Sequence, residues 1–208
     1  TTGRDSLEAI LDSWVGNIDS VIQKVKPVPT GTQKGQVFYQ SFNSPLFRQR
    51  YPDHQYHMYV PNHYSAATPM GLMIWLHGGG SWSATDIDHL AQYDMDNELV
   101  TGRSYARTET DNSNYILVAP IAPFGPVIPH PQHASRWDVP DADQYLMDII
   151  TEIAAKYNID YNRVVIAGFS MGGIGAYHQA LRLNDRLSAV MASAGSWSLG
   201  TWDGLKNM

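Results

Sequence analysis

Residues 164–175 constrain the fold more than any other part of the chain. The β-branched run 164–167 predicts a buried strand, and the residues that follow predict a helix packed on a sheet, with apolar positions at helical spacing: Ile174, Tyr177, Ala180 and Leu181. Between them stands the turn Gly168-Phe169-Ser170-Met171-Gly172. A sharp strand-to-helix turn flanked by glycines exposes a serine hydroxyl, as in a nucleophile elbow. Ser170 is therefore the candidate nucleophile.

The order of the remaining elements predicts an α/β protein. Four continuous apolar runs are typical of parallel strands buried on both faces: 72–76, 116–119, 164–167 and 189–192. Two shorter strands are expected before them, at 37–39 and 56–60, and a helix is predicted over 141–157. We expect a mostly parallel, doubly wound sheet flanked by helices, with the chemistry at the carboxyl ends of its strands.

Residues 1–35 have a different pattern. Asp5 and Glu8 form a capping box, apolar residues then recur every three or four positions as far as Val25, and Pro27 ends the helix. We expect an amphipathic helix and linker over 1–35 and a catalytic domain portion over 36–208. Such a stripe is typical of a helix that lies on its own domain, and formation of a homodimer through this helix is the alternative.

Composition excludes several classes of partner. The 208 residues are 43% hydrophobic, enough for one core, and the net charge of −6 with no basic cluster argues against nucleic acid. No apolar run approaches the ~20 residues of a membrane span. The absence of cysteine excludes disulfides and thiolate chemistry. A chain that starts at Thr1 rather than Met resembles a trimmed form, which favours a secreted or periplasmic protein.

A second glycine-rich motif, His77-Gly78-Gly79-Gly80-Ser81, follows the run 72–76. Glycines allow backbone N–H groups to approach a substrate closely, and fixed donors stabilise the negative charge that acyl transfer creates. We therefore predict an oxyanion hole formed by Gly79, Gly80 and the backbone N–H of Met171, and the sequence leaves open which glycine points inward. His77 is expected to be a structural residue of this loop.

The stretch Arg163–Ala176, with Tyr157–Asp160 before it and His77–Gly80 upstream, resembles the polyhydroxybutyrate depolymerase and feruloyl esterase-like branch of the α/β-hydrolases. The resemblance covers roughly residues 55–200 and is more specific for the fold and the nucleophile than for the substrate. It implies serine esterase activity at Ser170.

Partners for Ser170 are expected in the order serine, acid, histidine. The only histidine after Ser170 is His178, about 12 Å further along the same predicted helix and out of hydrogen-bond reach. Asp185 and Asp203 do not fit the position of the acid. We therefore expect the chain to lack its C-terminal strands, with the triad histidine and carboxylate beyond Met208, in a C-terminal segment of the same protein.

Four loop residues are predicted to bind substrate: Trp82, Trp137, Trp197 and His133. Flat rings at a cleft suit sugar faces or aromatic acyl groups, and the alternative is that they fill gaps between loops and sheet. The acidic residues between 86 and 98 lack the spacing of an EF-hand loop and are typical of a solvated helix face. No metal and no cofactor are expected.

Together these features predict a serine carboxylic ester hydrolase, of carboxylesterase type, that forms an acyl-enzyme on Ser170 and acts on a small-molecule or polymer-linked ester. A serine peptidase or acyltransferase of the same fold shares the nucleophile. A binding module that kept the turn and lost its base is the non-catalytic alternative.

Overall fold

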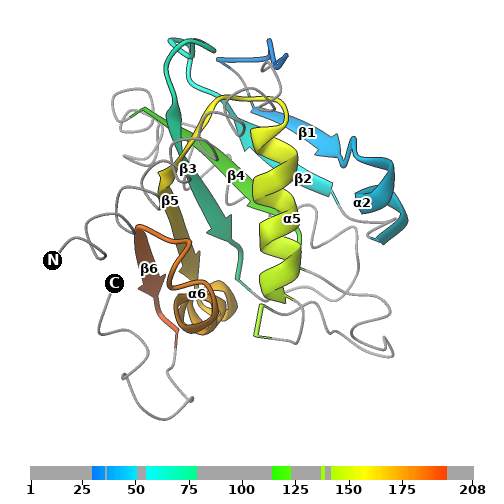
Figure 1. Ribbon diagram of the computed structural model, residues 1–208. Helices are drawn as coiled ribbons and strands as arrows, with labels where there is room; N and C mark the ends of the chain where they lie inside the picture. The colour runs from blue at the N-terminus through cyan, green and yellow to red at the C-terminus, as the bar shows by residue number, and fades with distance from the viewer. Residues whose placement is uncertain are drawn as a thin grey trace, which may run out of the picture.

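The computed structural model describes residues 30–35, 37–50, 55–78, 114–122, 137–138 and 142–195. The elements in chain order are β1 (Val37–Ser41), α2 (Pro45–Arg50), β2 (Gln55–Tyr59), β3 (Met70–Leu76), β4 (Tyr115–Pro120), α5 (Ala142–Ala154), β5 (Ile159–Phe169), α6 (Met171–Arg182) and β6 (Ala189–Ser193) (Figure 1). The predicted N-terminal helix lies outside the described residues, so the division at residue 35 and a homodimer through that helix stay predictions.

The strands form one sheet in the order β1-β2-β4-β3-β5-β6. From β4 to β6 neighbouring strands are parallel, whereas β1 and β2 pair antiparallel at the other edge. The predicted mostly parallel α/β sheet is therefore confirmed, and each of the six predicted strands is present. Within the described residues β6 is an edge strand.

Alternate residues of each central strand point to opposite faces of the sheet. On one face, Leu72, Ile74 and Ile166 belong to a large buried cluster that also holds Ile149 of α5 and Ala176 of α6, so both helices cover this face. On the other face, Leu117, Ala119 and Tyr59 form a second buried cluster. Burial on both faces explains why these strands are continuous apolar runs rather than alternating ones.

Helix α6 lies unusually close to the sheet because its first turns are built from glycine. A Cβ atom at Gly172 would overlap the carbonyl oxygen of Leu76 at the end of β3, and one at Gly173 would overlap the carbonyl oxygen of Ser193 at the end of β6. Any larger side chain at these positions would push the helix away from both strand ends.

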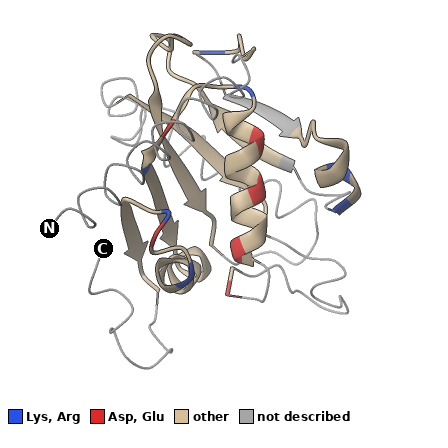
Figure 2. Ribbon diagram, viewed as in Figure 1, with Lys and Arg blue, Asp and Glu red and all other residues tan. Residues whose placement is uncertain are grey.

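Acidic residues are spaced along α5, as Figure 2 shows, and each has a basic partner. Asp148 pairs with Arg50 of α2, Glu152 with Lys156 at 3.5 Å, and Asp143 with Arg182 of α6 at 3.8 Å. The half-exposed pairs contribute little, on the order of 0–1 kcal/mol each. The buried Glu152 carboxylate instead depends on its partners, because an unpaired buried charge is costly.

Two segments differ from the sequence-based expectation. Residues 45–50 lie between the predicted strands 37–39 and 56–60, where no helix was predicted, but they form α2. The Ser44 hydroxyl accepts the Phe47 N–H at 3.5 Å, and the Phe47 ring packs edge-on against Phe42. Strand β5 begins at Ile159, earlier than the predicted 164, because Ile159 pairs with Met70 across an irregular register. Helix α2 is too short to show a helical period in the sequence, and the start of β5 depends on pairing with a strand that is distant in sequence.

No helix in the described ranges is long and apolar enough to cross a membrane.

We predict that Gly172→Ala lowers the free energy of unfolding by about 3 kcal/mol, because the added methyl group overlaps the backbone of β3. Without that contact, alanine in a helix would stabilise the protein by about 1 kcal/mol relative to glycine. Urea denaturation of the purified chain shows whether the substitution lowers or raises the free energy of unfolding.

Gly78→Ala is the matched control, since a Cβ atom there would find its nearest neighbours at an ordinary 3.5–3.6 Å. We expect it to change stability by less than about 1 kcal/mol. Equal losses for the two variants would contradict the close-packing explanation.

Candidate active site

Ser170 occupies the sharp turn between β5 and α6. Its backbone is strained, with φ 54° and ψ −114°, a region that residues with a side chain rarely adopt. Its N–H donates to the carbonyl oxygen of Ser193 at 2.9 Å, and its carbonyl accepts the N–H of Ile174 at 3.0 Å. The hydroxyl does not cap α6. The backbone thus holds a half-buried serine whose hydroxyl is not used by the helix.

The end of β6 supports this turn from one side. Ala194 also has a positive φ, 51°, where the chain leaves the strand. A Cβ atom at Gly195 would lie 2.6 Å from the backbone nitrogen of Ile174, so the strand end and the first turn of α6 are in direct backbone contact. Ser170 is therefore fixed by two strands and not by β5 alone.

The start of the glycine loop lies on the other side of Ser170. A Cβ atom at Gly78 would be 3.6 Å from the Cβ of Ser170 and 3.6 Å from the ring of Phe169. Met171 is the first residue of α6, where backbone N–H groups lack partners within the helix. The structure thus brings together Ser170, Met171 and the residue before Gly79, while Gly79 and Gly80 themselves lie outside the described residues.

The buried His77 side chain holds the start of the glycine loop through hydrogen bonds to the backbone. It is 1% exposed, and its Nε2 accepts the N–H of Ala122 at 3.0 Å, so the ring proton is on Nδ1. Nδ1 then donates to the carbonyl oxygen of Gly78 at 2.7 Å. Burial lowers the pKa of His77 to about 4, although the bond to Gly78 raises it in part. The imidazole is neutral at pH 7 and both nitrogens are occupied, in agreement with the structural role expected for it.

Trp137 connects this loop to α6. Its indole N–H donates to the carbonyl oxygen of His77 at 3.0 Å, and its own carbonyl accepts the Gln179 side-chain amide at 3.0 Å. The ring lies edge-on to the His77 imidazole and is fully buried. The contacts described for Trp137 are thus with the protein's own backbone and rings, and its predicted substrate-binding role stays a prediction.

Two residues of this region were missed in the sequence. Gln179 is fully buried on the inner face of α6, and the signal was a lone polar residue at a core position of an apolar helix. Phe169 is 49% exposed although its ring is large and apolar, and it lies directly beside Ser170. Its position within the Gly-x-Ser-x-Gly turn was the only signal.

Several predicted residues lie outside the described part of the chain, and their roles stay predictions: Trp82, His133, Trp197 and the acidic residues between 86 and 98. His178 belongs to α6, eight positions after Ser170, as expected from the sequence. Within the described residues, no group of three or more potential metal ligands occurs.

The buried His77 predicts a pH dependence of stability. Its folded pKa of about 4 lies below the ordinary value of 6.5, so the unfolded chain binds the proton more readily. Its contribution is therefore fully present above pH 6.5 and is lost as the pH falls toward 4, by up to about 3 kcal/mol. Urea denaturation at pH 7 and pH 5 should show this loss in the wild type and a smaller one in His77→Gln. An identical pH dependence in the two proteins would contradict the assignment.

Comparison with known proteins identifies the family. The model of the Esterase family ("Putative esterase") matches residues 52–204. The bifunctional acetylxylan esterase/xylanase XynS20E of Neocallimastix patriciarum is 26% identical over 141 residues, which cover 67% of this chain and 17% of that protein.

Two solved structures share the fold. A thermostable esterase superposes with a TM-score of 0.56 at 21% identity, covering 74% of this chain and 40% of that chain. A feruloyl esterase module from Clostridium thermocellum complexed with sinapinate superposes with a TM-score of 0.58 at 14% identity. The match covers 85% of this chain and 60% of that chain. The chain thus spans less than two thirds of the length of each of these relatives. Because the family model matches more than half of it, the chain belongs to the Esterase family, with the α/β-hydrolase fold.

Proposed function

We propose that the whole protein is a serine carboxylic ester hydrolase in which Ser170 is the nucleophile. The observation that carries the proposal is the strained turn at Ser170, beside which the glycine loop begins: a Cβ atom added at Gly78 would lie 3.6 Å from the Cβ of Ser170. A backbone strain of about 1–3 kcal/mol persists only where the surroundings enforce it, and such sites cluster at functional positions. Membership of the Esterase family supports the same role.

The proposed reaction proceeds through an acyl-enzyme. The Ser170 hydroxyl loses its proton to a histidine and its oxygen bonds to the ester carbonyl carbon, which gives a tetrahedral oxyanion. Collapse of this intermediate expels the alcohol, which takes the proton from the histidine. Water then cleaves the acyl-enzyme by the same route. The nitrogens of His77 are occupied and His178 lies too far along α6, so the proposal takes the histidine and its carboxylate partner from sequence beyond Met208.

The proposed oxyanion hole combines the backbone N–H of Met171 with that of Gly79 or Gly80. Met171 lies at the N-terminus of α6, where the helix dipole also favours negative charge. Donors held in place before the reaction are worth about 10²–10³ in rate each. The bond from His77 to the Gly78 carbonyl supports this assignment, because it orients the peptide group that leads into Gly79.

The proposed substrates are acyl esters of plant cell-wall polysaccharides. Relatives include an acetylxylan esterase and a feruloyl esterase module, and the half-exposed Phe169 ring offers an apolar surface beside Ser170. Trp82, Trp197 and His133 remain candidates for substrate contacts, and polyhydroxybutyrate is the alternative polymer. A cell-wall polysaccharide lies outside the cytoplasm, so secretion or export to the periplasm is part of the proposal.

We predict that a fluorophosphonate probe labels the complete protein and that Ser170→Ala abolishes both labelling and hydrolysis of aryl acetates, by at least about 10³-fold in kcat. Ser193→Ala is the control, because it keeps the carbonyl that accepts the Ser170 N–H. Undiminished labelling of Ser170→Ala would exclude this serine. Turnover of peptides but not esters would favour a peptidase, and acyl transfer without hydrolysis would favour an acyltransferase. An unlabelled complete protein without turnover would favour a binding module.

A second prediction distinguishes two possible roles of Trp137, positioning of the glycine loop and direct contact with the substrate. Trp137→Phe keeps an aromatic ring and removes the donor to the His77 carbonyl, at a cost of about 1–3 kcal/mol. If Trp137 acts by positioning the loop, kcat falls by a similar factor for acetyl and feruloyl esters while KM changes little. A change in KM that differs between the two acyl groups would instead indicate direct contact with substrate.

A further inference from the structure

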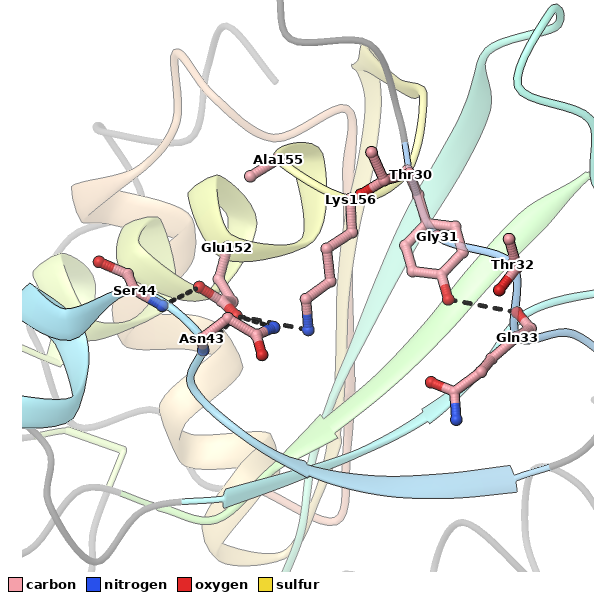
Figure 3. A pocket seen from close by; sticks show the side chains of 10 residues that line it. Thr30, Gly31, Thr32, Gln33, Asn43, Ser44, Glu152, Ala155 and Lys156 are labelled. Carbon is pink, nitrogen blue, oxygen red and sulfur yellow. Dashed lines mark hydrogen bonds and ion pairs between the residues drawn. The ribbon is translucent and has the colours of Figure 1, made fainter.

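A pocket lies at the end of the molecule opposite Ser170. It has a volume of about 610 Å³ and is bounded by residues 30–33, by Asn43 and Ser44 between β1 and α2, and by the C-terminal end of α5 (Figure 3). Tyr157, in its lining, precedes the first residue of β5, whereas Ser170 follows the last. At about 3.3 Å per strand residue, the pocket and the serine are roughly 25–35 Å apart. The size is within the range of small-molecule sites, about 300–1,000 Å³.

The wall formed by residues 30–33 is held by α5 and the residues after it. The Gly31 N–H donates to the carbonyl oxygen of Lys156 at 2.8 Å, and the Tyr157 hydroxyl donates to the carbonyl oxygen of Gln33 at 3.2 Å. Gly31 lies flat on the Tyr157 ring, where a Cβ atom would be 2.5 Å away from it. This wall therefore cannot shift without breaking these contacts.

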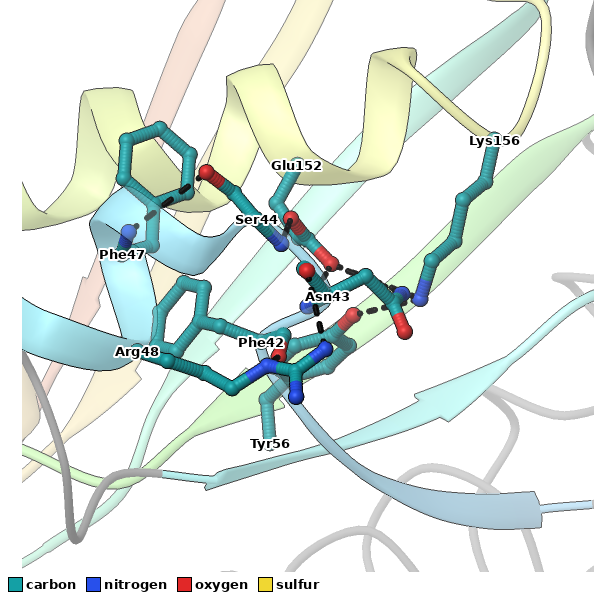
Figure 4. A network of polar contacts seen from close by, with 8 residues as sticks. All are labelled: Phe42, Asn43, Ser44, Phe47, Arg48, Tyr56, Glu152 and Lys156. Carbon is teal, nitrogen blue, oxygen red and sulfur yellow. Dashed lines mark hydrogen bonds and ion pairs between the residues drawn. The ribbon is translucent and has the colours of Figure 1, made fainter.

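The opposite wall is held by the buried carboxylate of Glu152. Its Oε1 accepts the backbone N–H of Asn43 at 2.7 Å and the side-chain amide of Asn43 at 2.9 Å, and Oε2 accepts the N–H of Ser44 at 3.2 Å (Figure 4). Glu152 also pairs with Lys156, which donates to the Tyr56 hydroxyl at 3.2 Å. The pocket is thus formed before any ligand arrives, which reduces the entropic cost of binding.

The chemistry of the lining selects a neutral ligand. Its two charged residues, Glu152 and Lys156, pair with each other, so they provide no net charge for an anion or a cation. The remaining polar groups are hydroxyls and amides, above all Thr30, Thr32, Gln33 and Asn43. These groups both donate and accept hydrogen bonds, as sugar hydroxyls do.

From this arrangement we infer a second binding site for a neutral, polyhydroxylated ligand, a sugar residue or short oligosaccharide, at the C-terminal end of α5. The site is remote from Ser170 and does not depend on ester hydrolysis. In a protein that acts on polysaccharides, it would hold a distant part of the chain whose ester is at the serine.

The test is isothermal titration calorimetry of the complete protein with xylotriose and cellotriose, and with inorganic phosphate as a charged comparison. We expect saturable binding of at least one trisaccharide, weak and in the millimolar range, about 4 kcal/mol. Ala155→Trp places a large ring in the pocket from an exposed position of the lining and should weaken binding at least about ten-fold. Ala67→Trp, at an exposed turn that is not part of the lining, is the matched control and should bind like the wild type.

A milder variant, Thr32→Val, removes one exposed hydroxyl and keeps the shape, and we expect a loss of about five-fold. Thermal unfolding of each variant verifies that it is folded. Fluorophosphonate treatment separates this site from the serine: sugar binding should persist on labelled protein, and if no label attaches, the Ala155→Trp comparison still decides. The inference is overturned by absent binding in the wild type, by equal binding in Ala155→Trp, by loss on labelling, or by phosphate binding more tightly than both sugars.

Discussion

The close approach of α6 to the ends of β3 and β6 is the contact on which the site depends. Gly172 meets the Leu76 carbonyl and Gly173 meets the Ser193 carbonyl, with no room for a side chain at either position. At this separation the turn between β5 and α6 must be sharp, and Ser170 takes a positive φ of 54°. The hydrogen bond from the Ser170 N–H to Ser193 offsets part of the strain. Helix packing, rather than the turn itself, therefore holds the serine in place.

A buried network of hydrogen bonds connects α6 to the glycine loop and fixes the position of the start of that loop. Gln179 of α6 holds Trp137, Trp137 holds the His77 backbone, and the His77 imidazole holds Gly78 next to Ser170. Within the described residues the Gln179 amide nitrogen has its partner and the buried Oε1 does not, so Gln179 fixes Trp137 through one hydrogen bond. Because His77 is neutral, the network orients the loop without burying a charge beneath it. The same helix thus determines the positions of both the serine and the loop proposed to face it.

Helix α5 runs between the two ends of the molecule where we propose binding sites. Near its N-terminal end Tyr145 bonds to Ile121, beside the network of Trp137 and His77, and at its C-terminal end Glu152 holds the link between β1 and α2 and one wall of the pocket. The contacts of Glu152 join residues 108 and 109 positions apart in the sequence. One helix therefore contacts both the strand ends near Ser170, where we propose catalysis, and the proposed sugar site at the opposite ends of the strands.

The sequence by itself determined the α/β class, the six strands and the place of Ser170, since each is written in a local pattern: apolar runs, a glycine-flanked turn and a helical period. It did not indicate α2, the early start of β5, the supporting role of Gln179 or the exposure of Phe169. Nor did it indicate that Glu152, an ordinary helix residue in sequence, would organise a pocket. These features depend on which distant residues meet, such as Gln179 with Trp137 or Glu152 with Asn43. Only the tertiary structure decided them, because hydrogen-bond satisfaction and close packing are properties of pairs that local periodicity does not encode.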